Sequence, residues 1–166
     1  MQRDDAPPVP PEHPFRRAWR TRDAQPWGDA LAPGITVYSP MLSAPFVGHA
    51  AVTELFTVLF EVLGHFEVTD EFESEGAHAF FWRVAVGGRT VEGVDLVHYD
   101  EQCLIREIRV MIRPLVDIAS FVAVVGPALA ARKGPRRGAL SRLMTTPLRG
   151  MFAAVDSLGA RLAGHH

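Results

Sequence analysis

Three runs of alternating apolar and polar residues, 77–86, 90–99 and 104–112, constrain the fold of this chain more than any other feature. A period of two residues is typical of a β-strand that buries one face. Gly87-Gly88 separates the first two runs in the way a two-residue hairpin turn would, and residues 100–102 make the next tight connection. Consecutive hairpins predict an antiparallel meander of three long strands.

Helical patterns lie on both sides of this meander. Residues 15–27 suit a short amphipathic helix, and residues 49–63 place apolar side chains at helical spacing, with Gly64 as the expected C-terminal cap. A strand at 35–38 ends at a Ser-Pro turn, and 67–74 is interpreted as a polar lead-in to the meander. Residues 115–131 form a strongly apolar helix, interrupted at 126–127. This order predicts an α+β fold.

The chain is long enough for one domain with a real core, since 48% of its 166 residues are apolar. We expect a disordered Pro-rich arm at 1–13, a domain at 14–131, a basic linker at 132–138 and an amphipathic basic helix at 139–166. The first residues lack the apolar stretch of a signal peptide, so the expected location is the cytoplasm.

Charge is unevenly distributed along the sequence. Residues 132–166 hold seven basic residues and one acidic residue, whereas residues 1–131 hold ten basic and eighteen acidic residues. The net charge of −2 argues against nucleic acid as a partner, and a single cysteine excludes a disulfide framework. For the basic helix we consider docking on the acidic body, docking on a second subunit, peripheral contact with an anionic membrane, or disorder. The helix at 115–131 is favoured as a packed core or dimer helix over a membrane span.

Asp95 is the most informative single residue, because a carboxylate in the middle of a strand is unfavourable. Strand parity places Asp95 on one face with Val91, Gly93 and Val97. A buried carboxylate needs a partner or a proton. Either Asp95 pairs with an arginine or it is a protonated functional group; the candidate arginines are Arg83, Arg89, Arg106, Arg109 and Arg113.

His78 is the candidate base beside Asp95, because it shares strand parity with three residues that we place on a pocket face, Phe80, Trp82 and Val84. The alternative is an ordinary core or rim histidine. No two of the histidines expected to be ordered stand at metal-ligand spacing, so we predict no metal site. The predicted lining of an apolar ligand pocket comprises Phe15, Trp19, Tyr38, Phe80, Trp82, Val84, Val97 and Val110.

Three segments together resemble the SnoaL-like polyketide cyclase and ketosteroid isomerase branch of the nuclear transport factor 2-like superfamily. They are ITVYSP, the hydrophobic-Asp-hydrophobic pattern before Tyr99-Asp100-Glu101, and LIREIRV, within a resemblance that spans about residues 14–131. The resemblance implies a cone-shaped, curved antiparallel sheet wrapped around N-terminal helices, here with extra C-terminal helices. It also implies an apolar pocket open at one end, a homodimer formed through the outer sheet face, and chemistry without a cofactor.

Compared residue by residue, the resemblance assigns Asp95 to the protonated aspartate that hydrogen-bonds a developing enolate in the isomerases. Ser39 stands where their carboxylate base would be, Phe15 where their donor tyrosine would be, and Val110 where the related epoxide hydrolases have an aspartate. Two functions therefore stay open. One is an acid–base enzyme (isomerase, cyclase, hydrolase or lyase) acting on a small apolar, polyketide- or steroid-like compound, with Asp95 as acid and His78 as base. The other is a non-catalytic module that binds a lipophilic ligand or serves for dimerisation.

Overall fold

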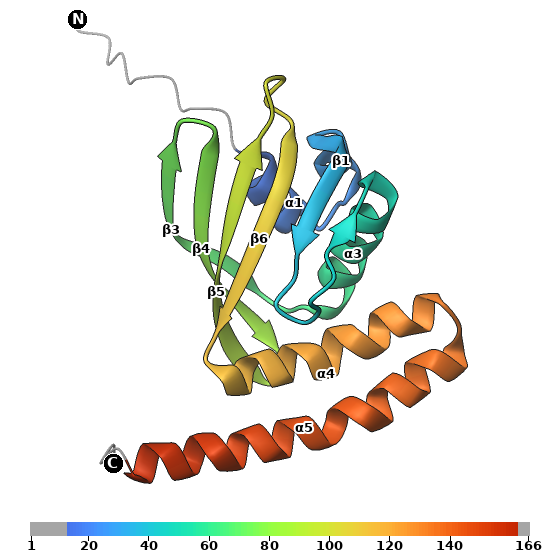
Figure 1. The fold of residues 1–166 in the computed structure, drawn as a ribbon, viewed down its shortest axis with the longest axis vertical. Helices are drawn as coiled ribbons and strands as arrows, with labels where there is room; N and C mark the ends of the chain where they lie inside the picture. Colours follow the sequence, from blue (N-terminus) through green and yellow to red (C-terminus); the bar gives the residue numbers. More distant parts are fainter. Residues whose placement is uncertain (1–12, 163–166) are drawn as a thin grey trace, which may run out of the picture.

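The computed structural model describes residues 13–162 and confirms the α+β class (Figure 1). The strands of its single sheet are β1 (Leu31–Tyr38), β2 (Phe46–Val47), β3 (Phe66–Ser74), β4 (Ala77–Val86), β5 (Arg89–Tyr99) and β6 (Ile105–Arg113). The helices are α1 (Pro14–Thr21), α2 (Gln25–Gly28), α3 (His49–Val62), α4 (Leu115–Arg132) and α5 (Pro135–Leu162). The predicted disordered arm lies outside the described residues except for His13, whose side chain accepts a hydrogen bond from the Phe15 N–H at the start of α1.

The predicted meander is present as β4, β5 and β6, with bounds within one residue of those expected. Gly87 and Gly88 both have positive φ, 56° and 80°, as a tight hairpin turn of this type requires. The sheet order is β2-β1-β6-β5-β4-β3. All neighbours are antiparallel except β1 and β6, which run parallel. The expected all-antiparallel sheet is therefore mixed at this one pairing.

Strand β3 was expected as a polar lead-in, and that expectation is wrong. It pairs with β4 along its whole length, from Phe66↔Val84 to Ser74↔Ala77. Most of its side chains are exposed, since it is the edge strand of the sheet and its far end extends beyond the core (Figure 1). A strand without a buried face leaves no alternation to detect in the sequence.

The helices also differ locally from the prediction. The expected helix at 15–27 breaks at Arg22, which adopts the left-handed conformation (φ 54°) between α1 and α2. Arg22 then donates to the carbonyls of Phe60 and Leu63 at the end of α3, both at 2.7 Å. The C-terminal cap of α3 is Leu63 and not the predicted Gly64. Gly64 is needed for close approach to β4, because a Cβ there would lie 2.9 Å from the Cβ of Ala85.

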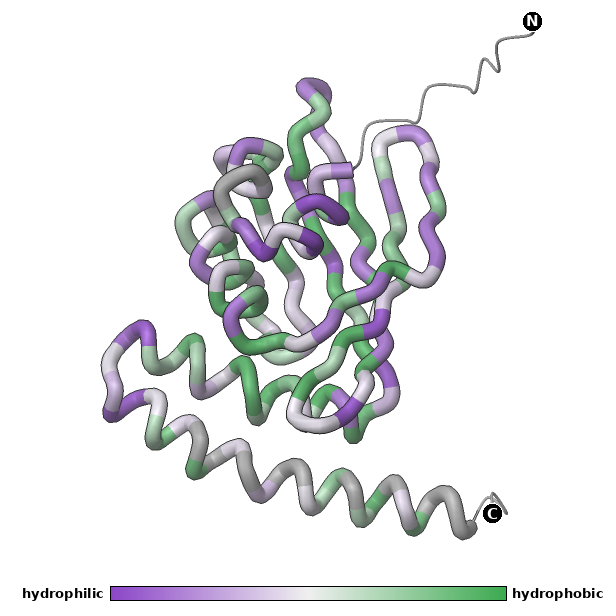
Figure 2. Tube along the Cα trace, turned by 180° about the vertical axis from the view of Figure 1, so that it is seen from behind, coloured by the Kyte–Doolittle hydropathy of each residue, from purple (hydrophilic) through white to green (hydrophobic). Residues whose placement is uncertain are grey.

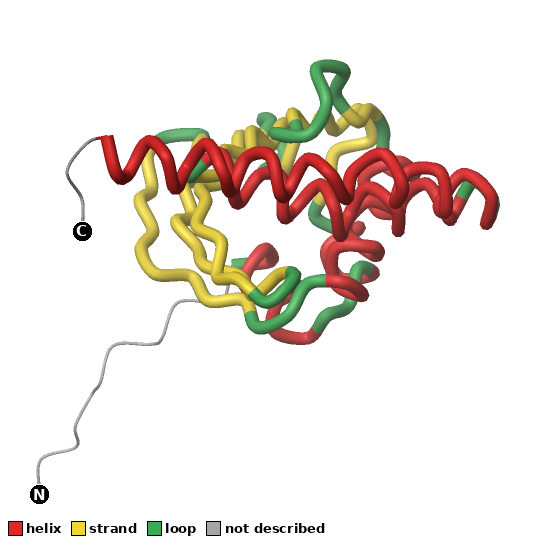
Figure 3. Tube along the Cα trace, turned by 90° about the horizontal axis from the view of Figure 1, so that it is seen from below, coloured by secondary structure: helices red, strands yellow, loops and turns green. Residues whose placement is uncertain are grey.

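The two C-terminal helices form an antiparallel hairpin across one end of the sheet (Figures 1 and 3). α4 runs through Gly126 and Pro127 without the expected interruption. α5 begins at Pro135, a residue suited to the first turn of a helix, so that only Lys133 and Gly134 connect the helices. The expected linker at 132–138 is thus mostly helical.

The core lies between the concave face of the curved sheet and the helices α1 and α3. Strand alternation is visible in β4, where Phe80, Trp82, Val84 and Val86 are buried and their neighbours are exposed. α4 covers the end of this core, with Phe121 and Val125 buried against it. α4 is also long and apolar enough to cross a membrane by length and composition, although here its buried residues contribute to the domain.

Gly93 in β5 makes room for Trp82, its partner in β4. A Cβ on Gly93 would lie 2.7 Å from the Met111 carbonyl oxygen and closer still to the indole ring of Trp82. Gly34 in β1 has no atom within 4 Å of the corresponding position. The same added methyl group thus meets a packed site in one strand and open space in another.

We predict that Gly93→Ala lowers the free energy of unfolding by about 1–3 kcal/mol, because either Trp82 or the β6 backbone must move. Gly34→Ala should stay within about 1 kcal/mol of the wild type. Urea unfolding of both variants measures the difference. Equal stabilities would show that Trp82 does not lie over Gly93.

Candidate functional site

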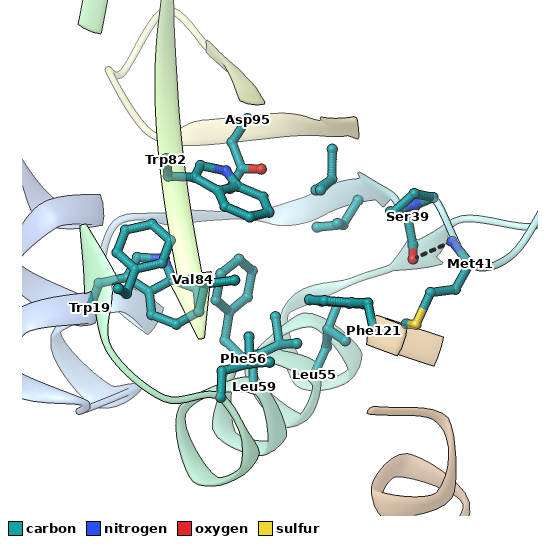
Figure 4. A pocket seen from close by; sticks show the side chains of 15 residues that line it. Trp19, Ser39, Met41, Leu55, Phe56, Leu59, Trp82, Val84, Asp95 and Phe121 are labelled. Carbon is teal, nitrogen blue, oxygen red and sulfur yellow. Dashed lines mark hydrogen bonds between the residues drawn. The ribbon is translucent and has the colours of Figure 1, made fainter. Parts of the chain in front are cut away.

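A small, mainly apolar cavity lies between the inner face of the sheet, α3 and α4 (Figure 4). Its volume is about 40 Å³, room for a few water molecules and much less than typical small-molecule sites offer. A larger ligand therefore requires some of the lining to move. The lining residues are Trp19, Val37, Ser39, Pro40, Met41, Leu55, Phe56, Leu59, Leu63, Phe66, Trp82, Val84, Asp95, Val110 and Phe121.

Asp95 is the only ionisable side chain among these lining residues, and it is 4% exposed. It points from the middle of β5 into the cavity, as strand parity predicted. Its Oδ1 has no hydrogen-bond partner among the described residues. Such a group is costly to ionise, since its surroundings replace little of the water that an anion would bind.

Burial accordingly raises the pKa of Asp95 from 3.8 to about 7. The indole N–H of Trp82, which lies next to the carboxyl group in Figure 4, opposes part of this rise in pKa. A pKa near 7 means that the acid and the carboxylate are both populated around neutral pH.

The structure does not support the alternative of an Asp95–arginine pair within the described residues. Arg83 pairs with Glu92, Arg89 with Asp117, and Arg109 with Glu107. Arg106 donates to the Tyr99 carbonyl, and Arg113 is exposed at the end of β6. These arginines lie at the surface and at the ends of the sheet, whereas Asp95 faces the interior.

Half of the predicted pocket residues line the cavity: Trp19, Trp82, Val84 and Val110. Phe15, Phe80 and Val97 are fully buried core residues that do not line it. Tyr38 is 42% exposed and lies on the outer face, where the Arg109 guanidinium is 5.1 Å from its ring centre. The prediction for Tyr38 rested on its aromatic ring and is wrong, because an aromatic ring does not say which face of a short strand a residue occupies.

The structure does not bring His78 into the cavity with Asp95. His78 stacks on Phe80 at 4.1 Å between ring centres and lies 4.9 Å from the ring of His13. Its Nε2 is 3.8 Å from a Glu71 oxygen. His78 thus belongs to a separate group near the turn of the β3–β4 hairpin, and its predicted role as the base beside Asp95 is not supported by this placement.

His13 in that group is held neutral. Desolvation lowers its pKa from 6.5 to about 4, with further contributions from His78 and Arg16. Because Nδ1 accepts from the Phe15 N–H, the ring proton is on Nε2, which faces the Tyr99 hydroxyl. This histidine serves as a helix cap that links α1 to β5.

Apart from Trp19 of α1, sequence reasoning did not predict as lining the residues that come from outside the strands, and it named Ser39 only through the family resemblance. Ser39, Pro40 and Met41 follow β1, and the Ser39 hydroxyl oxygen accepts a hydrogen bond from the Met41 N–H at 3.1 Å. Leu55 and Leu59 come from α3, whose helical stripe was visible in the sequence, but only as core. Phe121 of α4 had no signal, since it lies within a uniformly apolar segment.

The fold and this cavity define the chain as a member of the nuclear transport factor 2-like class, and comparisons specify the family. Residues 13–108, more than half of the chain, match the SnoaL-like domain. The chain therefore belongs to the SnoaL-like family. No curated protein matches it in sequence.

Among solved structures, the chain is similar to a steroid delta-isomerase from Pseudomonas aeruginosa, with 21% identity and a TM-score of 0.63 over 75% of this chain and 94% of that one. An uncharacterized protein with a cystatin-like fold from Silicibacter pomeroyi has 20% identity and a TM-score of 0.63, over 72% and 84% of the two chains. The epoxide hydrolase/cyclase-like enzyme SalBIII has 16% identity and a TM-score of 0.52, over 60% and 84%. At these identities the likeness establishes the fold.

The raised pKa of Asp95 predicts how stability depends on pH. Well below pH 3.8 the group is protonated in both folded and unfolded states and costs nothing. As pH rises toward 7 the unfolded state ionises first, so the wild type loses stability, on the order of 4 kcal/mol for a rise in pKa from 3.8 to about 7. Asp95→Asn abolishes this loss.

Urea unfolding of wild type and Asp95→Asn from pH 4.5 to 8.5 measures the effect. The difference between the two curves isolates Asp95, because groups such as His13 titrate in both proteins. We expect the variant to gain stability relative to the wild type as pH rises through this range. A constant difference would mean that Asp95 has an ordinary pKa.

Proposed function

We propose that this protein is an acid–base enzyme that works without a cofactor on a small apolar carbonyl compound. The observation that supports this most is the unpaired, buried carboxyl group of Asp95 at the wall of an apolar cavity. A structural carboxylate is expected to be paired, as Asp117 is with Arg89 at 2.6 Å. A carboxyl group left unpaired, with its pKa near neutral, is suited to proton transfer.

The reaction class that fits is enolisation, followed by isomerisation or ring closure of the substrate. Enolisation moves a proton from the carbon next to a carbonyl group to the carbonyl oxygen. A protonated carboxyl group can give its proton to that oxygen and accept the carbon-bound proton on its other oxygen, and it thereby returns to its starting form. Asp95 would perform both transfers, and the apolar surroundings would exclude competing water.

The lining indicates the class of substrate. Besides Asp95, the hydroxyl of Ser39 can donate a hydrogen bond, since its oxygen already accepts one from Met41. The remaining lining is mostly aromatic and aliphatic, which favours a compact apolar molecule with few polar groups. The names of two structural neighbours, a steroid delta-isomerase and an epoxide hydrolase/cyclase-like enzyme, are consistent with a steroid- or polyketide-like compound.

A second candidate is a binding module of the same fold that holds a lipophilic ligand without turnover. It is favoured by the lining itself, in which Asp95 is the single ionisable side chain. Ser39 is a poor base on its own, and His78 lies outside the cavity. In this case protonated Asp95 would only orient a carbonyl or hydroxyl group of the ligand.

The proposal includes a homodimer formed through the outer sheet face. The large apolar side chains exposed there include Phe72 at 64%, Phe81 at 40% and Met111 at 53%. Phe72 and Phe81 lie on the adjacent strands β3 and β4 with their rings in contact, and Met111 lies on β6, with β5 between β4 and β6. Covering them with a second copy would remove apolar surface from water.

Asp95→Asn tests the enzymatic proposal. We expect the variant to retain apolar ligands, because the amide has the same volume, but to lose turnover at least about 100-fold, because an amide cannot exchange a proton in this way. The assay is deuterium exchange of the α-protons of a cyclic ketone such as cyclohexanone, followed by NMR in D2O. Mass spectrometry of compounds that co-purify with the full chain identifies better substrates.

Asp70→Asn is the matched control, since the residue change is the same and Asp70 is exposed on β3, outside the cavity. Exchange that persists in Asp95→Asn would remove Asp95 from the mechanism. A ketone that binds the wild type without exchange would favour the binding module.

A further inference from the structure

α5 has two apolar sides, and the structure supplies a partner for one of them. The side toward α4 is marked by Gly138, where a Cβ would lie 2.9 Å from the Cβ of Ala131, and by Ser141, whose Oγ lies 3.6 Å from the position of a Cβ on Gly126. Thr145 and Phe152 follow at helical spacing and are half-buried. Packing on α4 therefore explains why small and apolar residues lie on this side of α5.

The other side of α5 is exposed. Its large apolar side chains recur at helical spacing along one stripe: Leu140 (59% exposed), Leu143 (73%), Met151 (53%), Val155 (59%) and Leu158 (58%). We call these five residues the α5 stripe. It extends over about 27 Å of helix, at a rise of 1.5 Å per residue. A monomeric soluble protein rarely exposes so many large apolar side chains along one side of a helix, so the α5 stripe indicates an interaction site.

The position of the α5 stripe favours a flat partner. α5 packs substantially on α4 alone among the described elements, and it forms the outermost layer at that end of the molecule (Figures 1 and 3). A protein partner for such a ridge would have to supply a complementary groove, whereas a lipid interface adapts to a protruding helix.

Charge narrows the choice of partner. Residues 132–166 carry six more positive than negative charges. Figure 2 shows the hydrophilic turn between α4 and α5, where Lys133, Arg136 and Arg137 are exposed and form no ion pair with a described residue. Arg136 and Arg137 precede Leu140 by four and three residues, so that they flank the start of the α5 stripe. Two copies of α5 would repel each other, whereas an anionic surface would attract the segment.

We propose that the α4–α5 hairpin binds anionic lipid bilayers, with the α5 stripe inserted at the interface and the basic turn on the headgroups. α5 packs on α4, and α4 supplies Phe121 to the cavity wall. Membrane binding through α5 would therefore hold the apolar cavity near the bilayer, separated from it by the α4–α5 hairpin. The inference does not depend on the chemistry of Asp95, since vesicle binding and proton exchange are measured separately.

The test is flotation of the full-length protein with vesicles of equal parts phosphatidylglycerol and phosphatidylcholine, and with phosphatidylcholine vesicles. We expect binding to the anionic vesicles that falls steeply as salt is raised, and much weaker binding to the neutral ones. Val155→Glu should lower binding to anionic vesicles at least about 10-fold, because a charge replaces an inserted side chain.

Val47→Glu is the matched control, since Val47 is 61% exposed on β2 and the charge change is the same. It should bind like the wild type, and both variants should melt as the wild type does. Equal binding of the wild type to both kinds of vesicle, or of both variants to the anionic one, would overturn the proposal. The proposal would also be overturned if the wild type self-associates without binding vesicles and the Val155→Glu variant is monomeric. The partner of the α5 stripe would then be a second copy of the chain.

Discussion

A carboxyl group in the middle of a strand can stay unpaired and largely protonated inside a protein only if the structure around it keeps bulk water and cations away. Asp95 meets this condition through its neighbours in the sheet. Gly93, two residues before it on the same face, lets the indole of Trp82 lie flat beside the carboxyl group. Helices α3 and α4 then close the cavity with aliphatic and aromatic side chains. The raised pKa of Asp95 follows from this enclosure.

The second buried carboxyl group, Asp117, shows the contrasting arrangement. Arg89 at the start of β5 pairs with it, and this contact fixes the first turn of α4 to the β4–β5 hairpin. One turn further along, α4 presents Phe121 to the cavity. A paired acid therefore helps to position the helix that encloses an unpaired one. Asp117 stabilises the fold because Arg89 lies beside it. Asp95 has no such cation among the described residues, so its carboxyl group is free to exchange a proton.

The sequence predicts the centre of this domain well and its periphery poorly. Alternation and Gly87-Gly88 predict β4, β5 and β6, and parity alone places Asp95, Trp82 and Val110 on the inner face. β3 has no buried face along most of its length, so it leaves no such signal. Parity also puts His78 on the inner face, but it cannot show that Phe80 stands between His78 and the cavity. The contribution of α4 depends on long-range packing that no local pattern encodes.

The protonation state of Asp95 is the point on which the account of the cavity depends, and it can be measured directly. A carbon-13 NMR titration of the aspartate side-chain carboxyl groups in the wild type, with Asp95→Asn to assign the resonance, gives the pKa of this one residue. We predict a midpoint near pH 7, well above the values of exposed aspartates. A midpoint at or below about pH 4 would contradict the account, because Asp95 would then be an ordinary ionised side chain with a partner or with water beside it.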